Sequence, residues 1–266
     1  MSSYVLCIFE GKKAEPNITH SLCNCILNSE DKVILRASYG FNIYKLYAEL
    51  KKDPYLDTYE LIAEELKKRR VAENRQGKEL NEDELAVINI DDSTLISDIY
   101  LIFDYDAHCT NANDEKLTEM LEKFSDAQDE GLLLVSYPMV EAIKHQQGAK
   151  YQEEVYPISG FANYKSWTNT YSLLDKRYQN WGAYDFDIWK EIIEHHLARA
   201  NYLLNEQLSL PVSQLESRDI FMQQLEKHIP DGNVAVVSSF PLMLFDFYGD
   251  RLQSRLIQRS SVKSYD

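Results

Sequence analysis

The sequence predicts an α/β fold in which a parallel sheet is flanked by helices. Two observations support this prediction. Short apolar runs rich in β-branched and aromatic residues alternate with segments of helical apolar spacing, and two of these runs end at acidic residues. Alternation of strands and helices along a chain is typical of a parallel sheet covered by helices. A chain of 266 residues can bury a substantial core without disulfides or a structural metal.

The first predicted elements lie in the first forty residues. The apolar run 4–9 predicts a buried strand that stops at Glu10, where Gly11 permits a tight turn. Pro16 stands where a helix can begin, and the apolar spacing after it predicts a helix to about residue 28. A second strand is expected over residues 32–37.

The next predicted segment is a helical insertion over about residues 42–95. Helical spacing continues to about residue 75 with a break at Asp53-Pro54, and residues 74–83 are polar and predict a loop. Much of the charge lies in this insertion, which lacks a strong strand signal.

The strand pattern then returns and completes the predicted sheet. A third strand is expected over residues 99–103 and stops at Asp104-Tyr105-Asp106. A helix over about residues 114–128 and a fourth strand over residues 132–135 follow. We therefore expect an α/β domain over residues 1–150.

Residues 151–266 predict a mainly helical C-terminal region. One long helix is expected over residues 186–208, and the apolar segment 234–247 predicts a strand followed by a helix. The last residues of the sequence are rich in basic side chains. These cationic residues recur every four positions and therefore share one stripe of a helix: Arg251, Arg255, Arg259 and Lys263. This stripe is interpreted as a contact for nucleic-acid phosphates or a partner protein, with an ordinary solvated helix face as the alternative.

Composition restricts the function classes. The net charge of −15 argues against a protein that grips nucleic acid over a wide surface, because phosphate contacts need clustered Lys and Arg. The four cysteines lack the paired C-x2-C spacing of a zinc site, the first residues lack the layout of a signal peptide, and no apolar run is long enough to cross a membrane. We expect a cytoplasmic protein without a membrane segment.

Acidic residues follow two strands of the predicted sheet. Glu10 ends the first strand, and Asp104 and Asp106 end the third. Functional groups in an open parallel sheet gather at the carboxyl ends of the strands, and alternate residues of an extended segment point the same way. Three carboxylates at one point repel each other unless a cation neutralises them. Mg²⁺ suits this role because it prefers hard oxygen ligands and also takes phosphate oxygens, and Mn²⁺ is an alternative ion.

These segments resemble a known family. FEGKKAEPN at residues 9–17, together with IYLIFDYDAH at residues 99–108, resembles the Toprim domain of topoisomerases, primases and several nucleases. The EG-x-x-x-EP form is similar to the RloB-like branch, and the whole resembles the AriB-like effectors of the PARIS phage-defence system. The resemblance covers roughly residues 4–145.

The resemblance implies a Mg²⁺-dependent nuclease that cleaves DNA or RNA, with tRNA among the candidates. It further implies a phage-defence effector that an ATPase partner holds inactive, and self-association into a homo-oligomer stays open. Carried over by position, Glu10 is a metal ligand or general base, and Asp104 and Asp106 are metal ligands. Glu141, after the fourth strand, is a candidate additional metal ligand.

Two further residues near the acids are candidates for chemistry. Lys12 follows the turn and is positioned to hold a scissile phosphate, although exposed turn lysines are usually only solvated. His108 lies two residues beyond the acid pair and is a candidate for proton transfer, with an inert loop histidine as the alternative.

Two other functions stay open. FDYDAH at residues 103–108 is also similar to the Asp-x-Asp nucleophile motif of haloacid-dehalogenase-like phosphatases, in which the first Asp is phosphorylated. That interpretation leaves Glu10-Gly11 without a role. The third interpretation is a non-catalytic regulatory subunit whose acidic surface docks on an ATPase.

Overall fold

The computed structural model describes residues 3–27, 32–53, 55, 57–147 and 154–262, with the backbone alone for residues 258–262. Five strands form one sheet in the order β2-β1-β3-β5-β4, and all pairs except β4–β5 are parallel. The strands are β1 (Ser3–Phe9), β2 (Lys32–Ser38), β3 (Ile96–Asp104), β4 (Ser125–Asp126) and β5 (Gly131–Ser136). The predicted α/β fold with a parallel sheet is therefore confirmed.

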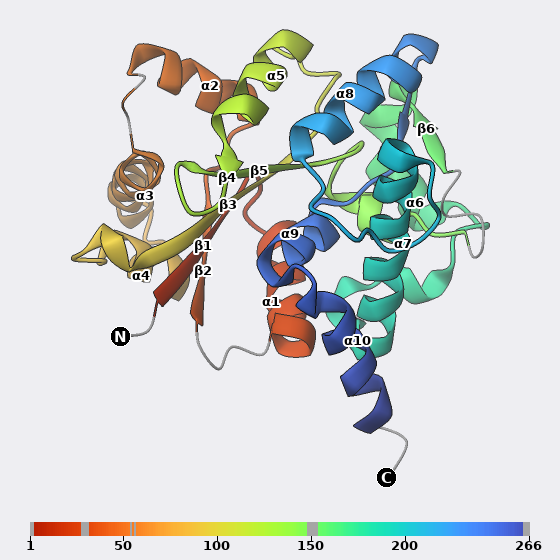
Figure 1. Ribbon diagram of the computed structural model, residues 1–266. Coiled ribbons are helices and arrows are strands. Elements are labelled where there is room, and N and C mark those ends of the chain that lie inside the picture. The colour runs from red at the N-terminus through yellow and green to blue at the C-terminus, as the bar shows by residue number, and fades with distance from the viewer. Residues whose placement is uncertain (1–2, 28–31, 54, 56, 148–153, 263–266) are drawn as a thin grey trace.

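Helices cover both faces of this sheet (Figure 1). Helix α1 lies on the face that α9 (Ser239–Tyr248) also covers, whereas α3 lies on the opposite face (Figure 1). The helices of this part of the chain are α1 (Ala14–Leu22), α2 (Ile43–Lys52), α3 (Thr58–Asn74), α4 (Glu82–Ile88) and α5 (Asp114–Lys123). The helical insertion predicted between the second and third strands thus consists of α2, α3 and α4.

The central strands are buried on both faces, as expected for a parallel sheet between two helical layers. All six residues of β5 are buried, and so are the last five residues of β1. Their runs of Leu, Ile, Val and Phe therefore supply the hydrophobic core, and the polar groups that follow each strand emerge at its carboxyl end.

Several element boundaries differ from the sequence predictions. The helix expected over about residues 114–128 ends at Lys123, because the fully buried Phe124 turns the chain into the core, and β4 then pairs with β5. The long helix α7 (Phe186–Asn205) ends before residue 208, where Glu206 takes a left-handed conformation at φ 58°. The first helix continues as a π-helical turn over Cys23–Leu27.

The C-terminal region is mainly helical, as predicted, and includes a small antiparallel pair of strands. Its elements are β6 (Val155–Pro157), α6 (Tyr164–Thr170), α7, α8 (Ser217–Lys227), β7 (Asn233–Ala235), α9 (Ser239–Tyr248) and α10 (Arg251–Val262). Helix α9 contacts β3 and β5, so this region contributes to the same buried cluster as the sheet. The division predicted at residue 150 falls within residues 148–153, which lie outside the described residues.

No helix in the described part of the chain has the length and apolarity that crossing a membrane requires.

Gly131 is a position where the fold requires glycine. It has a φ of +117°, and a Cβ there would lie 2.7 Å from Leu101 Cδ1 and 3.3 Å from the Ile99 carbonyl oxygen. Gly131→Ala is therefore expected to lower the free energy of unfolding by about 2–4 kcal/mol, from backbone strain and overpacking together.

Gly77 provides a matched control for this prediction. It also has a positive φ, +69°, but no described atom lies within 4 Å of a Cβ placed there. Gly77→Ala is expected to cost only about 1 kcal/mol. Urea unfolding of both variants measures the difference, and equal losses would show that close contact at Gly131 is not the cause.

Candidate metal centre

The predicted acidic residues lie where the direction of the chain through the sheet reverses. From β1 the chain crosses to β2 at one side, whereas from β3 it continues to β5 at the other. The carboxyl ends of β1 and β3 are neighbours, and such a switch point is where open α/β sheets bind ligands. Glu10 follows β1, Asp104 is the last residue of β3, and Asp106 comes two residues later.

Backbone hydrogen bonds fix the turn that carries Glu10. The amide of Gly40 donates to the Glu10 carbonyl oxygen at 3.0 Å, and the Ser38 hydroxyl donates to the Gly11 carbonyl oxygen at 2.8 Å. The amide of Gly11 donates to Glu15 Oε1 at 3.1 Å. A Cβ on Gly11 would lie 2.7 Å from Glu15 Oε2, so glycine lets the turn approach this carboxylate closely.

The carboxyl groups at this switch point repel each other. Burial raises the pKa of Glu10 to about 8, and repulsion from the Asp106 carboxylate is the next largest cause. A hydrogen bond from the backbone of Asp104 opposes this shift. The pKa of Asp104 is raised well above its usual range, mainly by burial and then by repulsion from Glu10. Both residues are partly exposed, although burial is the largest cause of each raised pKa.

The donor set fits a hard divalent cation. Oε2 of Glu10 is buried and has no hydrogen-bond donor among the described residues. Oxygen atoms of Glu10, Asp104 and Asp106 do not all lie within 4.8 Å of one another among the described residues, so an ion would draw these carboxylates together. All three groups are carboxylates, which are the ligands that Mg²⁺ and Mn²⁺ prefer. Their roles as metal ligands stay predictions.

Glu141 and Glu15 add two more carboxylates beside this centre. Both side chains are buried, and both raise the pKa of Asp104 by repulsion. Glu141 Oε1 lies 3.6 Å from Nζ of Lys165, whose side chain is exposed at the start of α6. Sequence reasoning identified Glu141 but missed Glu15 and Lys165. The signal for Glu15 was available, since it occupies the first turn of a helix four residues after the Gly11 turn.

Lys12 lies on the same turn but binds elsewhere. Its Nζ is 3.1 Å from Glu73 Oε1 on α3, and its side chain is 53% exposed. The proposed contact with a scissile phosphate therefore requires the lysine to leave Glu73. The catalytic role of Lys12 stays a prediction.

Asp106 also belongs to a second group of side chains. His108 Nδ1 lies 3.9 Å from Asp106 Oδ1, and the Cys109 thiol donates to Asp106 Oδ2 at 3.2 Å. Potential ligand atoms of these three residues all lie within 4.8 Å of one another. Burial, followed by the hydrogen bond to Asp106, raises the pKa of the Cys109 thiol to about 11.

The described members of the basic stripe on α10, Arg251 and Arg255, contact residues away from the acids. Arg255 Nε donates to the Ile26 carbonyl oxygen at 2.9 Å, just before the segment that leads into β2, and its guanidinium lies over the Tyr248 ring. This contact places Arg255 at the amino-terminal edge of the sheet, opposite Glu10, and gives it a structural role that the sequence did not indicate. Arg251 is exposed. The side chain of Arg259 and all of Lys263 lie outside the described residues. The nucleic-acid role of the stripe stays a prediction.

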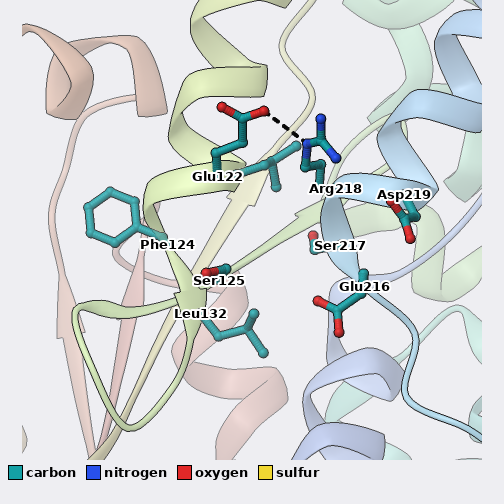
Figure 2. Close-up of a pocket in the computed structure, with 9 residues that line it drawn as sticks. Glu122, Phe124, Ser125, Leu132, Glu216, Ser217, Arg218 and Asp219 are labelled. Atoms are coloured by element: carbon teal, nitrogen blue, oxygen red, sulfur yellow. Dashed lines mark hydrogen bonds and ion pairs between the residues drawn. The ribbon is translucent and has the colours of Figure 1, made fainter.

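A cavity of about 450 Å³ lies between α5, β4 and α8, near the residue where β5 begins. Figure 2 shows Arg218 directed toward Glu122, and Arg218 Nε donates to Glu122 Oε1 at 3.0 Å. The lining includes Leu132 near the start of β5 and none of the acidic residues at the carboxyl ends of β1 and β3. The cavity is therefore separate from the candidate metal centre.

Comparison of this chain with protein-family models, with curated proteins and with solved structures found no match. The functional proposal therefore depends on the side chains of the site themselves.

Proposed function

We propose that this protein is a Mg²⁺-dependent phosphodiester hydrolase that cleaves DNA or RNA. The single observation that carries this proposal is the group of carboxyls at the switch point between β1 and β3. Glu10 has a pKa raised to about 8 and a buried oxygen without a donor among the described residues, and both features suit a group that would bind a cation.

Each acid has a defined part in the proposal. Glu10, Asp104 and Asp106 would hold the ion, and Glu141 would bind a second ion or orient ligands of the first. A bound Mg²⁺ polarises a phosphoryl group and lowers the pKa of a coordinated water. Without an ion, the raised pKa keeps a proton on Glu10 at neutral pH, beside the Asp106 side chain.

Two lysines beside the acids support a phosphate-containing substrate. Lys165 is exposed and lies next to Glu141, while the buried Lys144 lies 4.0 Å from the centre of the Trp181 ring. Desolvation lowers the pKa of Lys144, with the Glu141 carboxylate acting against that shift. Cations confined to this small region suit contact with one or two phosphates, and they are compatible with a chain whose net charge is −15.

A cleavage assay tests the proposed function. The purified protein is incubated with end-labelled RNA and DNA in Mg²⁺ or Mn²⁺, and in parallel with EDTA. We expect cleavage that requires the metal and stops with EDTA. Turnover of a small phosphomonoester with intact nucleic acid would favour the phosphatase alternative and overturn the nuclease proposal.

Thermal unfolding as a function of pH gives an independent prediction. Because the pKa of Glu10 is raised from 4.5 to about 8, the folded protein keeps a proton that the unfolded chain releases within this window. Without metal, the contribution of Glu10 to the free energy of unfolding is therefore fully present below about pH 4.5. It is lost as the pH rises toward 8. The full loss is on the order of a few kcal/mol.

Mg²⁺ is expected to reverse this loss, because the ion replaces the proton on Glu10. The increase in Tm from Mg²⁺ should be larger at about pH 8.5 than at about pH 5.5. Glu10→Gln should reduce the difference between the two values, because its amide does not titrate. An equal Mg²⁺ effect at both pH values in the unaltered protein would contradict the proposed ion site.

A further inference from the structure

We propose that Asp106, His108 and Cys109 form a binding site for Zn²⁺, and that zinc in this site competes with Mg²⁺ for Asp106. The zinc site itself is independent of the nuclease proposal, whereas the inhibition that follows from competition rests on it.

The geometry of the three side chains supports a common ion. A turn brings them together, since the Cys109 amide donates to the Asp106 carbonyl oxygen at 2.9 Å. Oxygen, nitrogen and sulfur atoms of the three residues already lie within 4.8 Å of one another. Tetrahedral zinc has bonds of about 2.0–2.3 Å to such ligands, so modest side-chain rotations are enough to reach one ion.

The ligand types distinguish this site from the carboxylates beside it. Imidazole and thiolate select zinc and similar transition metals, whereas Mg²⁺ prefers oxygen ligands. Binding converts the Cys109 thiol to a zinc-bound thiolate and releases one proton to solvent, without any change in oxidation state. Three protein ligands leave one position for water.

An ion can reach this site from solvent. The His108 side chain is 43% exposed and Cys109 is partly exposed, so entry requires no unfolding. The His108 ring lies edge-on to Phe161 with ring centres 6.4 Å apart, which restricts its orientation.

Sharing of Asp106 links the two sites. Its side chain interacts with Glu10 and also accepts a hydrogen bond from the Cys109 thiol. Once zinc holds this carboxylate, the remaining pair of Glu10 and Asp104 binds Mg²⁺ more weakly. Free zinc would then act as an inhibitor, with His108 and Cys109 as the residues that provide sensitivity.

Direct zinc titration tests the site without any activity assay. Zn²⁺ affinity is measured by competition with a chromogenic chelator for the unaltered protein, Cys109→Ser and His108→Ala. Each variant is expected to bind Zn²⁺ at least about tenfold more weakly, since even outer-shell changes cost 10–100-fold. Cys23→Ser, which removes a partly exposed thiol of the π-helical turn, is the matched control and should bind like the unaltered protein.

Cobalt substitution identifies the thiolate. Co²⁺ should produce a thiolate-to-metal charge-transfer band that Cys109→Ser lacks and Cys23→Ser retains. Equal zinc affinity in all four proteins, or a cobalt band that persists in Cys109→Ser, would overturn the proposed site.

The activity assay separates this inference from the proposed function. If the protein cleaves nucleic acid, Zn²⁺ should inhibit it, and His108→Ala should be less sensitive at the same Mg²⁺ concentration. Cleavage that persists when zinc saturates the site would overturn the competition. Tight zinc binding without any metal-dependent cleavage would leave the zinc site in place and remove the nuclease proposal.

Discussion

Asp104→Asn is expected to lower the rate of nucleic-acid cleavage by about 10³-fold, because loss of a metal ligand removes several kcal/mol of transition-state stabilisation. Asparagine keeps the shape of the side chain and removes its negative charge. Since burial, followed by repulsion from neighbouring carboxylates, raises the pKa of Asp104, the substitution removes a charge that the metal-free site disfavours. The variant should therefore fold at least as stably as the unaltered protein.

Asp126→Asn is the matched control for this substitution. Asp126 is exposed on β4 at the edge of the same sheet, distant in the fold from the β1–β3 switch point. The control should retain full cleavage, measured on the same labelled substrate and normalised to folded protein by circular dichroism. Full cleavage by Asp104→Asn would rule out a ligand role for this residue.

Arg199→Met is expected to lower the free energy of unfolding by about 3–5 kcal/mol, the cost of leaving a buried charge without its partner. Arg199 is 1% exposed on α7, and its NH2 lies 3.3 Å from Glu154 Oε2. Its NH1 also donates to the Val236 carbonyl oxygen. Methionine fills similar space but leaves both acceptors without this donor. Urea unfolding measures the loss.

Arg218→Met tests the same substitution in an exposed ion pair. Arg218 pairs with Glu122 at 3.0 Å, and about half of each side chain is exposed. Solvent screens such pairs, so the expected loss is below about 1 kcal/mol. Similar losses for the two arginine variants would contradict a structural role for the buried Arg199–Glu154 pair.

Much of the sheet and its acidic edge could be predicted from the sequence. The apolar runs that end at Glu10 and Asp104 are long and uninterrupted, because central parallel strands are buried on both faces. The order β2-β1-β3-β5-β4 brings the ends of β1 and β3 together, and the alternation of strands and helices alone does not specify that order. The sequence displays the acids at the strand ends directly, whereas the proximity of Glu10 to Asp104 and Asp106 depends on β1 and β3 being neighbours.

Other features depend on contacts between distant segments, which local patterns do not reveal. Arg255 was expected to share a phosphate-binding stripe, yet it donates to the Ile26 carbonyl oxygen more than two hundred positions earlier. Lys165 lies beside Glu141 only because α6 returns to the acidic edge. The sequence also gave no zinc spacing for Cys109, since its partners, Asp106 and His108, are not paired cysteines.

Crystals soaked in millimolar Mn²⁺ and measured for anomalous scattering provide the most direct test of the candidate metal centre. We expect one anomalous peak that is coordinated by Glu10, Asp104 and Asp106. Absence of a peak between these side chains, or a peak bound without Glu10, would contradict the proposal that residues from the ends of β1 and β3 share a divalent cation.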